Sequence, residues 1–232
     1  MYKNCNKLVR AFVALSFLGI SALSAQPREQ PELISLDFKT LRFGPPIEAL
    51  KFDDGETVQT IGVSTNSLGN ARKYRGPNPI VFFRERETND PENPIERVPV
   101  ASVRVPEGMS EALVLFIVSN SGSSPQRIQT RVIDASRSSF DQGEMQFLNF
   151  SPLAVGCMIG ENRFTIDPGE REVIAPEPVE DLQVVRMAFF DDEWQSFKRT
   201  AWRLPDRERI WVIVSQDPDS GLIRVAAIPE FF

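Results

Sequence analysis

The chain has 232 residues, a formal net charge of −6 and no histidine. Without histidine it lacks the commonest general base and metal ligand, which excludes Ser-His and Cys-His nucleophile pairs and zinc sites built on histidine. The acidic balance argues against nucleic acid or an anionic membrane surface as a partner.

The first 25 residues have the features of a secretory signal peptide. A basic start precedes an apolar run from Ala11 to Ile20, and small residues follow before Gln26. The run is shorter than the roughly 20 residues that a membrane-spanning helix needs. We therefore expect cleavage after Ala25 and an exported product, periplasmic or extracellular, with no membrane span. An uncleaved N-terminal anchor is the alternative.

The remaining chain contains an internal repeat. Leu41–Pro45 recurs as Leu148–Pro152, and Gly55–Ile61 recurs as Gly160–Ile166. In the same order along the chain, Phe82-Phe83 aligns with Phe189-Phe190, and Leu115 aligns with Trp211. Ordered matches of this kind indicate a duplicated module of about a hundred residues.

Each module contains short runs rich in Val, Ile and Phe that are cut by Pro, Gly, Asn and Asp, a pattern typical of strands and turns. In the first module we expect strands at residues 34–43, 58–63, 80–84, 98–105, 112–119 and 128–134. In the second module we expect them at residues 145–150, 155–159, 163–166, 172–174, 182–190, 197–204, 209–215 and 223–228.

Many short strands at this spacing predict an all-β protein of two tandem antiparallel Ig-like β-sandwich modules related by internal duplication. Residues 135–142 have linker composition. We therefore divide the chain into a signal peptide (1–25), a first module (26–138) and a second module (139–232). A single β domain built from both halves is the alternative.

Two predicted strands are apolar on both of their faces. Ala112–Val118 and Ile210–Val214 contain no polar residue. A strand with one solvent-exposed face should alternate between apolar and polar residues. These two strands should therefore be covered on both sides or lie at the module interface, with Trp211 in the core.

Cys157 is the only cysteine left after signal cleavage, so the mature chain has no intramolecular disulfide. It lies in the apolar stretch Val155–Ile159, which favours a small buried core residue. An intermolecular disulfide or a reactive thiol is the alternative.

Candidate binding residues cluster in the second module. Trp194 ends the acidic segment Asp191–Glu193, which we interpret as a solvated turn whose Trp folds back onto the sheet. Calcium binding by the carboxylates and a Trp platform for a sugar ring are the alternatives. We take Trp194, Trp202 and Arg203 as the candidate ligand surface.

Two further motifs have simpler interpretations. The basic residues Lys198, Arg199, Arg203, Arg207 and Arg209 should pair with nearby acids, Asp206, Glu208 and Asp192 among them; an anionic glycan is the alternative partner. The Asn149-Phe150-Ser151 match to an N-glycosylation site falls in a predicted strand, so we interpret it as a coincidence.

The segment Phe147–Pro152, followed by Gly160–Phe164 and Ile166–Glu170 with its Pro-Gly-Glu turn, resembles small exported bacterial Ig-like β-sandwich modules. The resemblance implies a component of the cell envelope or of a matrix. It identifies structural turns and strands, and it carries over no catalytic or ligand residues.

We therefore expect an exported, non-catalytic binding or structural module of the cell envelope or an extracellular assembly. Its partner would be a protein or a polysaccharide, with no cofactor, no metal and no catalytic residue. A carbohydrate-binding module using Trp194 and Trp202 is one alternative. The other is a glycan-active enzyme using two carboxylates, one with a raised pKa, in a shared cleft.

Overall fold

The computed structural model describes residues 32–119, 127–177, 182–217 and 220–232, and these form sixteen strands and no helix. The predicted signal peptide lies outside the described residues. The first eight strands are β1 (Leu33–Phe43), β2 (Leu50–Asp53), β3 (Val58–Ile61), β4 (Arg72–Pro77), β5 (Ile80–Glu87), β6 (Ile95–Val103), β7 (Glu111–Ser119) and β8 (Arg127–Asp134). The second eight are β9 (Met145–Phe150), β10 (Ala154–Ile159), β11 (Asn162–Ile166), β12 (Arg171–Ile174), β13 (Gln183–Asp191), β14 (Glu193–Trp202), β15 (Glu208–Gln216) and β16 (Ile223–Phe231). No helix that could cross a membrane occurs in the described part of the chain.

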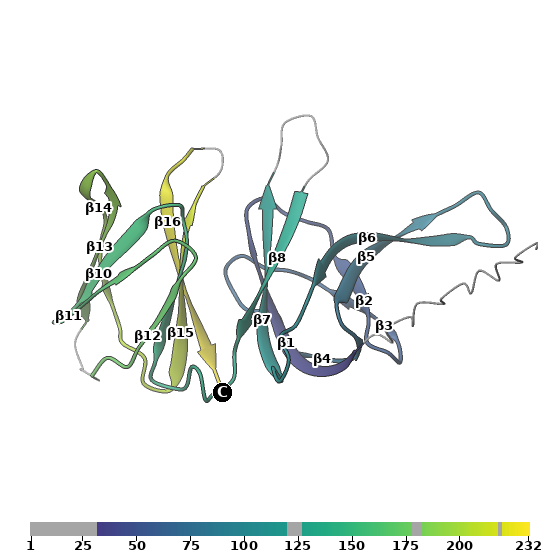
Figure 1. Cartoon of the computed structure of the whole chain (residues 1–232), viewed down its shortest axis with the longest axis horizontal. Helices are drawn as coiled ribbons and strands as arrows, with labels where there is room; N and C mark the ends of the chain where they lie inside the picture. Colours follow the sequence, from purple (N-terminus) through teal and green to yellow (C-terminus); the bar gives the residue numbers. More distant parts are fainter. Residues whose placement is uncertain (1–31, 120–126, 178–181, 218–219) are drawn as a thin grey trace, which may run out of the picture. The chain divides into compact units, whose positions relative to one another are not determined.

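The strands form four four-stranded sheets (Figure 1). Module 1 contains sheet A, in the order β4-β1-β7-β8, and sheet B, in the order β3-β2-β5-β6. Module 2 contains sheet C, in the order β12-β9-β15-β16, and sheet D, in the order β11-β10-β13-β14. Adding eight to each strand number of module 1 reproduces module 2, including the parallel pairs β1–β7 and β9–β15. The predicted fold class, two tandem β-sandwich modules related by duplication, is confirmed.

The strand registers correct one part of the repeat alignment. Leu41 pairs with Leu115, and its counterpart Leu148 pairs with Ile213. Leu115 therefore corresponds to Ile213 and not to Trp211, whose counterpart lies two positions earlier in β7. Because side chains alternate with a period of two along a strand, the slip left Trp211 on the expected face.

A second error in the repeat alignment also amounts to two residues. Lys51 pairs with Phe83, and Gly156, which the repeat places at the position of Lys51, pairs with Ala188. Phe82-Phe83 therefore corresponds to Met187-Ala188, two residues before Phe189-Phe190. The register shift of each module falls at this same point, between Phe82 and Phe83 and between Met187 and Ala188. A duplicated bulge is further support for duplication, because bulges are specific structural features.

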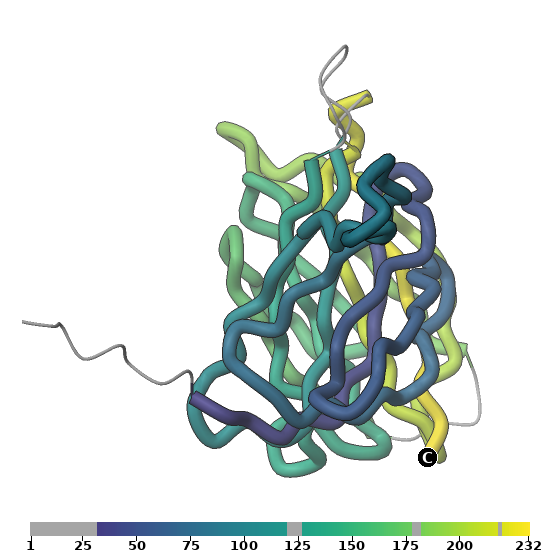
Figure 2. The backbone as a smooth tube through the Cα atoms, turned by 90° about the vertical axis from the view of Figure 1, so that its right-hand side faces the viewer, coloured from purple at the N-terminus to yellow at the C-terminus, as the bar shows by residue number. Residues whose placement is uncertain are grey.

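Three apolar cores separate the four sheets, and the strand axes are roughly aligned with one another in the tube view (Figure 2). One core fills module 1 between sheets A and B, and another fills module 2 between sheets C and D. The third lies between sheets A and C and joins the modules; its buried members are Leu41, Leu113, Leu115, Ile133, Ala135, Phe140, Leu148, Trp211, Ile213 and Ile228. The two strands predicted to be apolar on both faces, now β7 and β15, each contribute to two cores, which confirms that prediction.

Buried charges accompany the apolar contact between the modules. Glu230 on β16 accepts hydrogen bonds at 2.7 Å from Arg209 Nε and from Trp211 Nε1, and it also pairs with Lys39 on β1. Arg209 and Glu230 are 3% and 5% exposed. Phe140 is buried against Trp211 although it lies in the segment with linker composition. The connection between the modules is thus part of their interface.

Candidate functional site

The face of sheet D that points away from its core carries an ordered pattern of side chains. On β10 and β13 the residues Cys157, Ile159, Val185 and Met187 are buried in the core between sheets C and D, so the alternate positions lie on the opposite face. Cross-strand pairing arranges this outer face into rows. From one end of the sheet to the other, the rows are aromatic, small and cationic.

Trp194 dominates the aromatic row. It pairs with Phe190, and the two rings meet at 5.3 Å between centroids with an interplanar angle of 60°. The Trp194 side chain is 52% exposed. Its six-membered ring covers Gly156, where an added Cβ would approach Cζ3 to 3.0 Å. Glycine at this position and Phe190 beside it thus hold a large, half-exposed aromatic surface in place.

The middle row consists of small residues. Thr165, Gly156, Ala188 and Ser196 lie side by side across all four strands. They form the floor of a groove of about 750 Å³, which is bounded by Trp194 at one side and by Arg163 and Arg186 at the other. Four residues along a strand separate the aromatic row from the cationic row, which is about 13 Å.

The third row carries three arginines. Arg163 and Arg186 both pair with Met158, and Arg186 also pairs with Arg199, so the row crosses the sheet from β11 to β14. All three arginine side chains are exposed. Within the part of the chain that the structure describes, none forms an ion pair. The groove therefore combines an aromatic wall with a cationic wall.

The three residues predicted as a ligand surface do not lie together. Trp202 is at the opposite end of β14 from Trp194, about 26 Å away along the strand. It is half-buried against the core between sheets C and D. Arg203 is exposed and follows the end of β14. Trp194 alone of the three lines the groove.

The groove residues that sequence reasoning missed are Gly156, Arg163 and Arg186. The available signal was the position of Arg186 between two apolar residues, in Val185-Arg186-Met187. The row itself depends on cross-strand register, which the residue pattern of one strand does not reveal.

The basic residues between Lys198 and Arg209 and the acidic segment Asp191–Glu193 have different environments in the structure. Arg209 is buried and pairs with Glu230, so its expected pairing with nearby acids is wrong. Arg207 lies 3.9 Å from Asp206. The acidic segment forms the reversal between β13 and β14, with Asp192 at a φ of 60°. No group of three or more potential metal ligands occurs within the described ranges.

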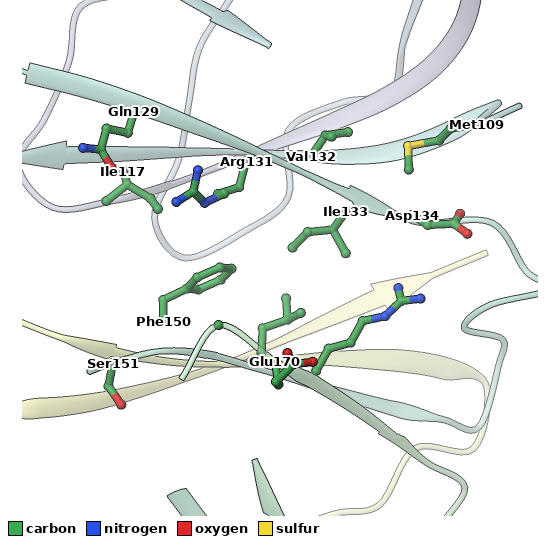
Figure 3. A pocket seen from close by; sticks show the side chains of 13 residues that line it. Met109, Ile117, Gln129, Arg131, Val132, Ile133, Asp134, Phe150, Ser151 and Glu170 are labelled. Atoms are coloured by element: carbon green, nitrogen blue, oxygen red, sulfur yellow. The ribbon is translucent and has the colours of Figure 1, made fainter. Parts of the chain in front are cut away.

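A second cleft, of about 690 Å³, lies where the two modules face each other (Figure 3). Gln129, Arg131 and Ile133 on β8 face Phe150 and Glu170 across it. Its acids are Asp134 and Glu170. Burial opposes ionisation of Asp134, but hydrogen bonds from Ser136 and Ser139 and the nearby Arg171 outweigh it, so the pKa of Asp134 is lowered.

The pKa values of other carboxyl groups are shifted in the same direction as that of Asp134. In the described chain, the carboxyl groups with a shifted pKa are all lowered: Asp54, Asp90, Asp134 and Glu230. A general acid that works near neutral pH needs a raised pKa. The carboxylate-dependent alternative therefore gains no supporting observation from these groups.

Two predicted structural residues lie where expected. Cys157 is buried in the core of module 2. Asn149 is fully buried, and its side-chain nitrogen donates to the carbonyl oxygens of Leu153 and Ile166. Its side-chain oxygen accepts from the backbone and the hydroxyl of Ser151. The glycosylation match is thus a structural residue in the folded chain.

No protein-family model matches this chain, and no curated protein sequence matches it at a significant level.

Proposed function

We propose that the protein is exported and acts as a non-catalytic binding module of the cell envelope or an extracellular assembly, holding a polysaccharide in the groove of sheet D. The export rests on the predicted signal in residues 1–25. The partner class rests on the groove.

One observation carries the proposal. Trp194 is half-exposed, yet Phe190 and Gly156 define its position. An aromatic surface held in place before binding loses little conformational entropy when it packs against the C–H face of a sugar ring. The floor of small residues beside it leaves room for the ring, and the groove crosses the sheet to both edge strands.

Affinity electrophoresis of the mature chain (from Gln26) through gels that contain single polysaccharides tests the proposal. We expect at least one polymer to retard the protein and Trp194→Ala to abolish the retardation. Phe231→Ala is the matched control, because Phe231 is an exposed aromatic on β16, outside the groove. Equal retardation of the wild type and the Trp194→Ala variant would refute a role for this groove.

A further inference from the structure

We infer that the groove of sheet D selects a polyuronate, a polysaccharide whose repeating sugar carries a carboxylate, and that the arginine row binds that carboxylate. The inference rests on the proposed function, since it names the ligand class of the same groove.

The arginine row destabilises the sheet, because it places like charges next to each other. Arg186 and Arg199 lie directly opposite each other on neighbouring strands. Like charges in this arrangement are destabilising. No acidic side chain of the described residues pairs with either guanidinium. The unneutralised row thus offers its charge to a ligand.

The position of the row sets the geometry of the ligand. The Trp194 ring lies over Gly156 in the middle row, and Arg163 and Arg186 lie two residues further along their strands, about 7 Å from that row. A sugar ring against Trp194 would direct its ring substituents along this floor. A carboxylate is a suitable substituent, because guanidinium groups bind carboxylates through paired, charge-assisted hydrogen bonds.

The net charge of the chain indicates that a polyanion would bind through local contacts in the groove and not through long-range attraction to the protein. The net charge is −6, so long-range electrostatics repel a polyanion. A polyanion therefore binds here only through short-range contacts. These contacts should be specific to the groove and should weaken as added salt screens them.

Two polymers with the same backbone provide the test. Polygalacturonate carries one free carboxylate per sugar, and fully methyl-esterified polygalacturonate carries none. We expect the mature protein to bind the acid form about tenfold or more tightly, which is the worth of one charge-assisted hydrogen bond. Arg186→Gln should reduce binding of the acid form to near the level of the ester. Arg207→Gln removes the same charge from an exposed position of module 2 and should change nothing.

The outcomes separate this inference from the proposed function. Equal binding of both polymers, lost with Trp194→Ala but kept with Arg186→Gln, would overturn the inference and leave the polysaccharide groove in place. Binding of poly-glutamate that needs Arg186 but not Trp194 would point to an acidic peptide and overturn both. Binding of neither galacturonate polymer would overturn the inference, and the wider polysaccharide screen would then decide the proposed function alone.

Discussion

Cys157 lies on β10 and is 4% exposed in the core between sheets C and D. Burial away from water raises the pKa of its thiol to about 12, so almost no thiolate exists near neutral pH. We predict that a thiol reagent such as DTNB labels the mature chain slowly at pH 8 and completely after unfolding in guanidinium. A Cys157→Ser variant supplies the background. Rapid stoichiometric labelling of the native protein would contradict the buried position.

Gln146 is a second buried residue with an unusual environment. It lies on β9 and is fully buried, and neither atom of its amide has a hydrogen-bond partner among the described residues. An unsatisfied buried polar group costs about 1–3 kcal/mol. Gln146→Met keeps the length of the side chain, so we predict a rise of that order in the free energy of unfolding, measured by urea denaturation. Gln129→Met, at an exposed position of β8, should leave the free energy of unfolding unchanged. A lower free energy of unfolding for Gln146→Met would indicate that the amide has a hydrogen-bond partner.

At the scale of the strands, Asn149 ties β9 to its neighbours. Its side chain accepts or donates four hydrogen bonds to residues that follow β9 and to the end of β11. Asn149→Ala would leave the buried carbonyls of Leu153 and Ile166 unpaired. We predict a loss of about 2–3 kcal/mol in the free energy of unfolding. Asn162→Ala, at an exposed position of β11, serves as control, and a similar small effect of both changes would contradict the network.

The strands show what the sequence can and cannot predict. All fourteen expected strands match observed ones, but β2 and β4 were missed. Leu50–Asp53 is only four residues long and Arg72–Pro77 is largely polar, so their local patterns are weak. The counterparts β10 and β12 in module 2 were expected. Aligning these two strands with module 1 through the internal repeat would have located β2 and β4. Pairing with neighbouring strands, rather than local propensity, forms β2 and β4.

The same physics limits the prediction of the site. Alternation has a period of two, so the face of a residue survives an alignment slip of two positions, as it did for Trp211. The position of a residue along its strand, in contrast, is wrong after such a slip. Trp194 and Trp202 share β14 but lie at its two ends, and Arg163 and Arg186 become neighbours in one row through β10. Register is a property of the assembled sheet, which explains why Trp194 was identified and the arginine row was not.

At the scale of the whole molecule, the two modules share one apolar interface between sheets A and C. Lys39 belongs to module 1, whereas Glu230, Arg209 and Trp211 belong to module 2. Removing one partner of a buried ion pair leaves an uncompensated charge, at a cost of about 3–5 kcal/mol. The buried pair Arg209–Glu230 lies within module 2, and the ion pair of Glu230 with the partly exposed Lys39 connects it to module 1.

Glu230 makes these ion pairs dependent on pH. Burial would raise the pKa of Glu230, but hydrogen bonds from Arg209, Lys39 and Trp211 outweigh it, and the pKa is lowered from its ordinary value of 4.5. A lowered folded-state pKa means that the stabilisation is complete above the unfolded value and is lost as the pH falls through the folded value. The acid limb of the stability profile should therefore lie below pH 4.5.

Glu230→Gln tests this origin of the acid limb. We predict that the variant loses about 3 kcal/mol at pH 7, because Arg209 then lacks its buried carboxylate. Its deficit relative to the wild type should shrink below pH 4.5, where the wild-type carboxyl becomes protonated. Urea denaturation from pH 7 to pH 3 measures both effects, and Glu172→Gln, an exposed change on β12 of the same sheet, is the control. A deficit that stays constant across this range would show that the Glu230 carboxylate does not link stability to pH.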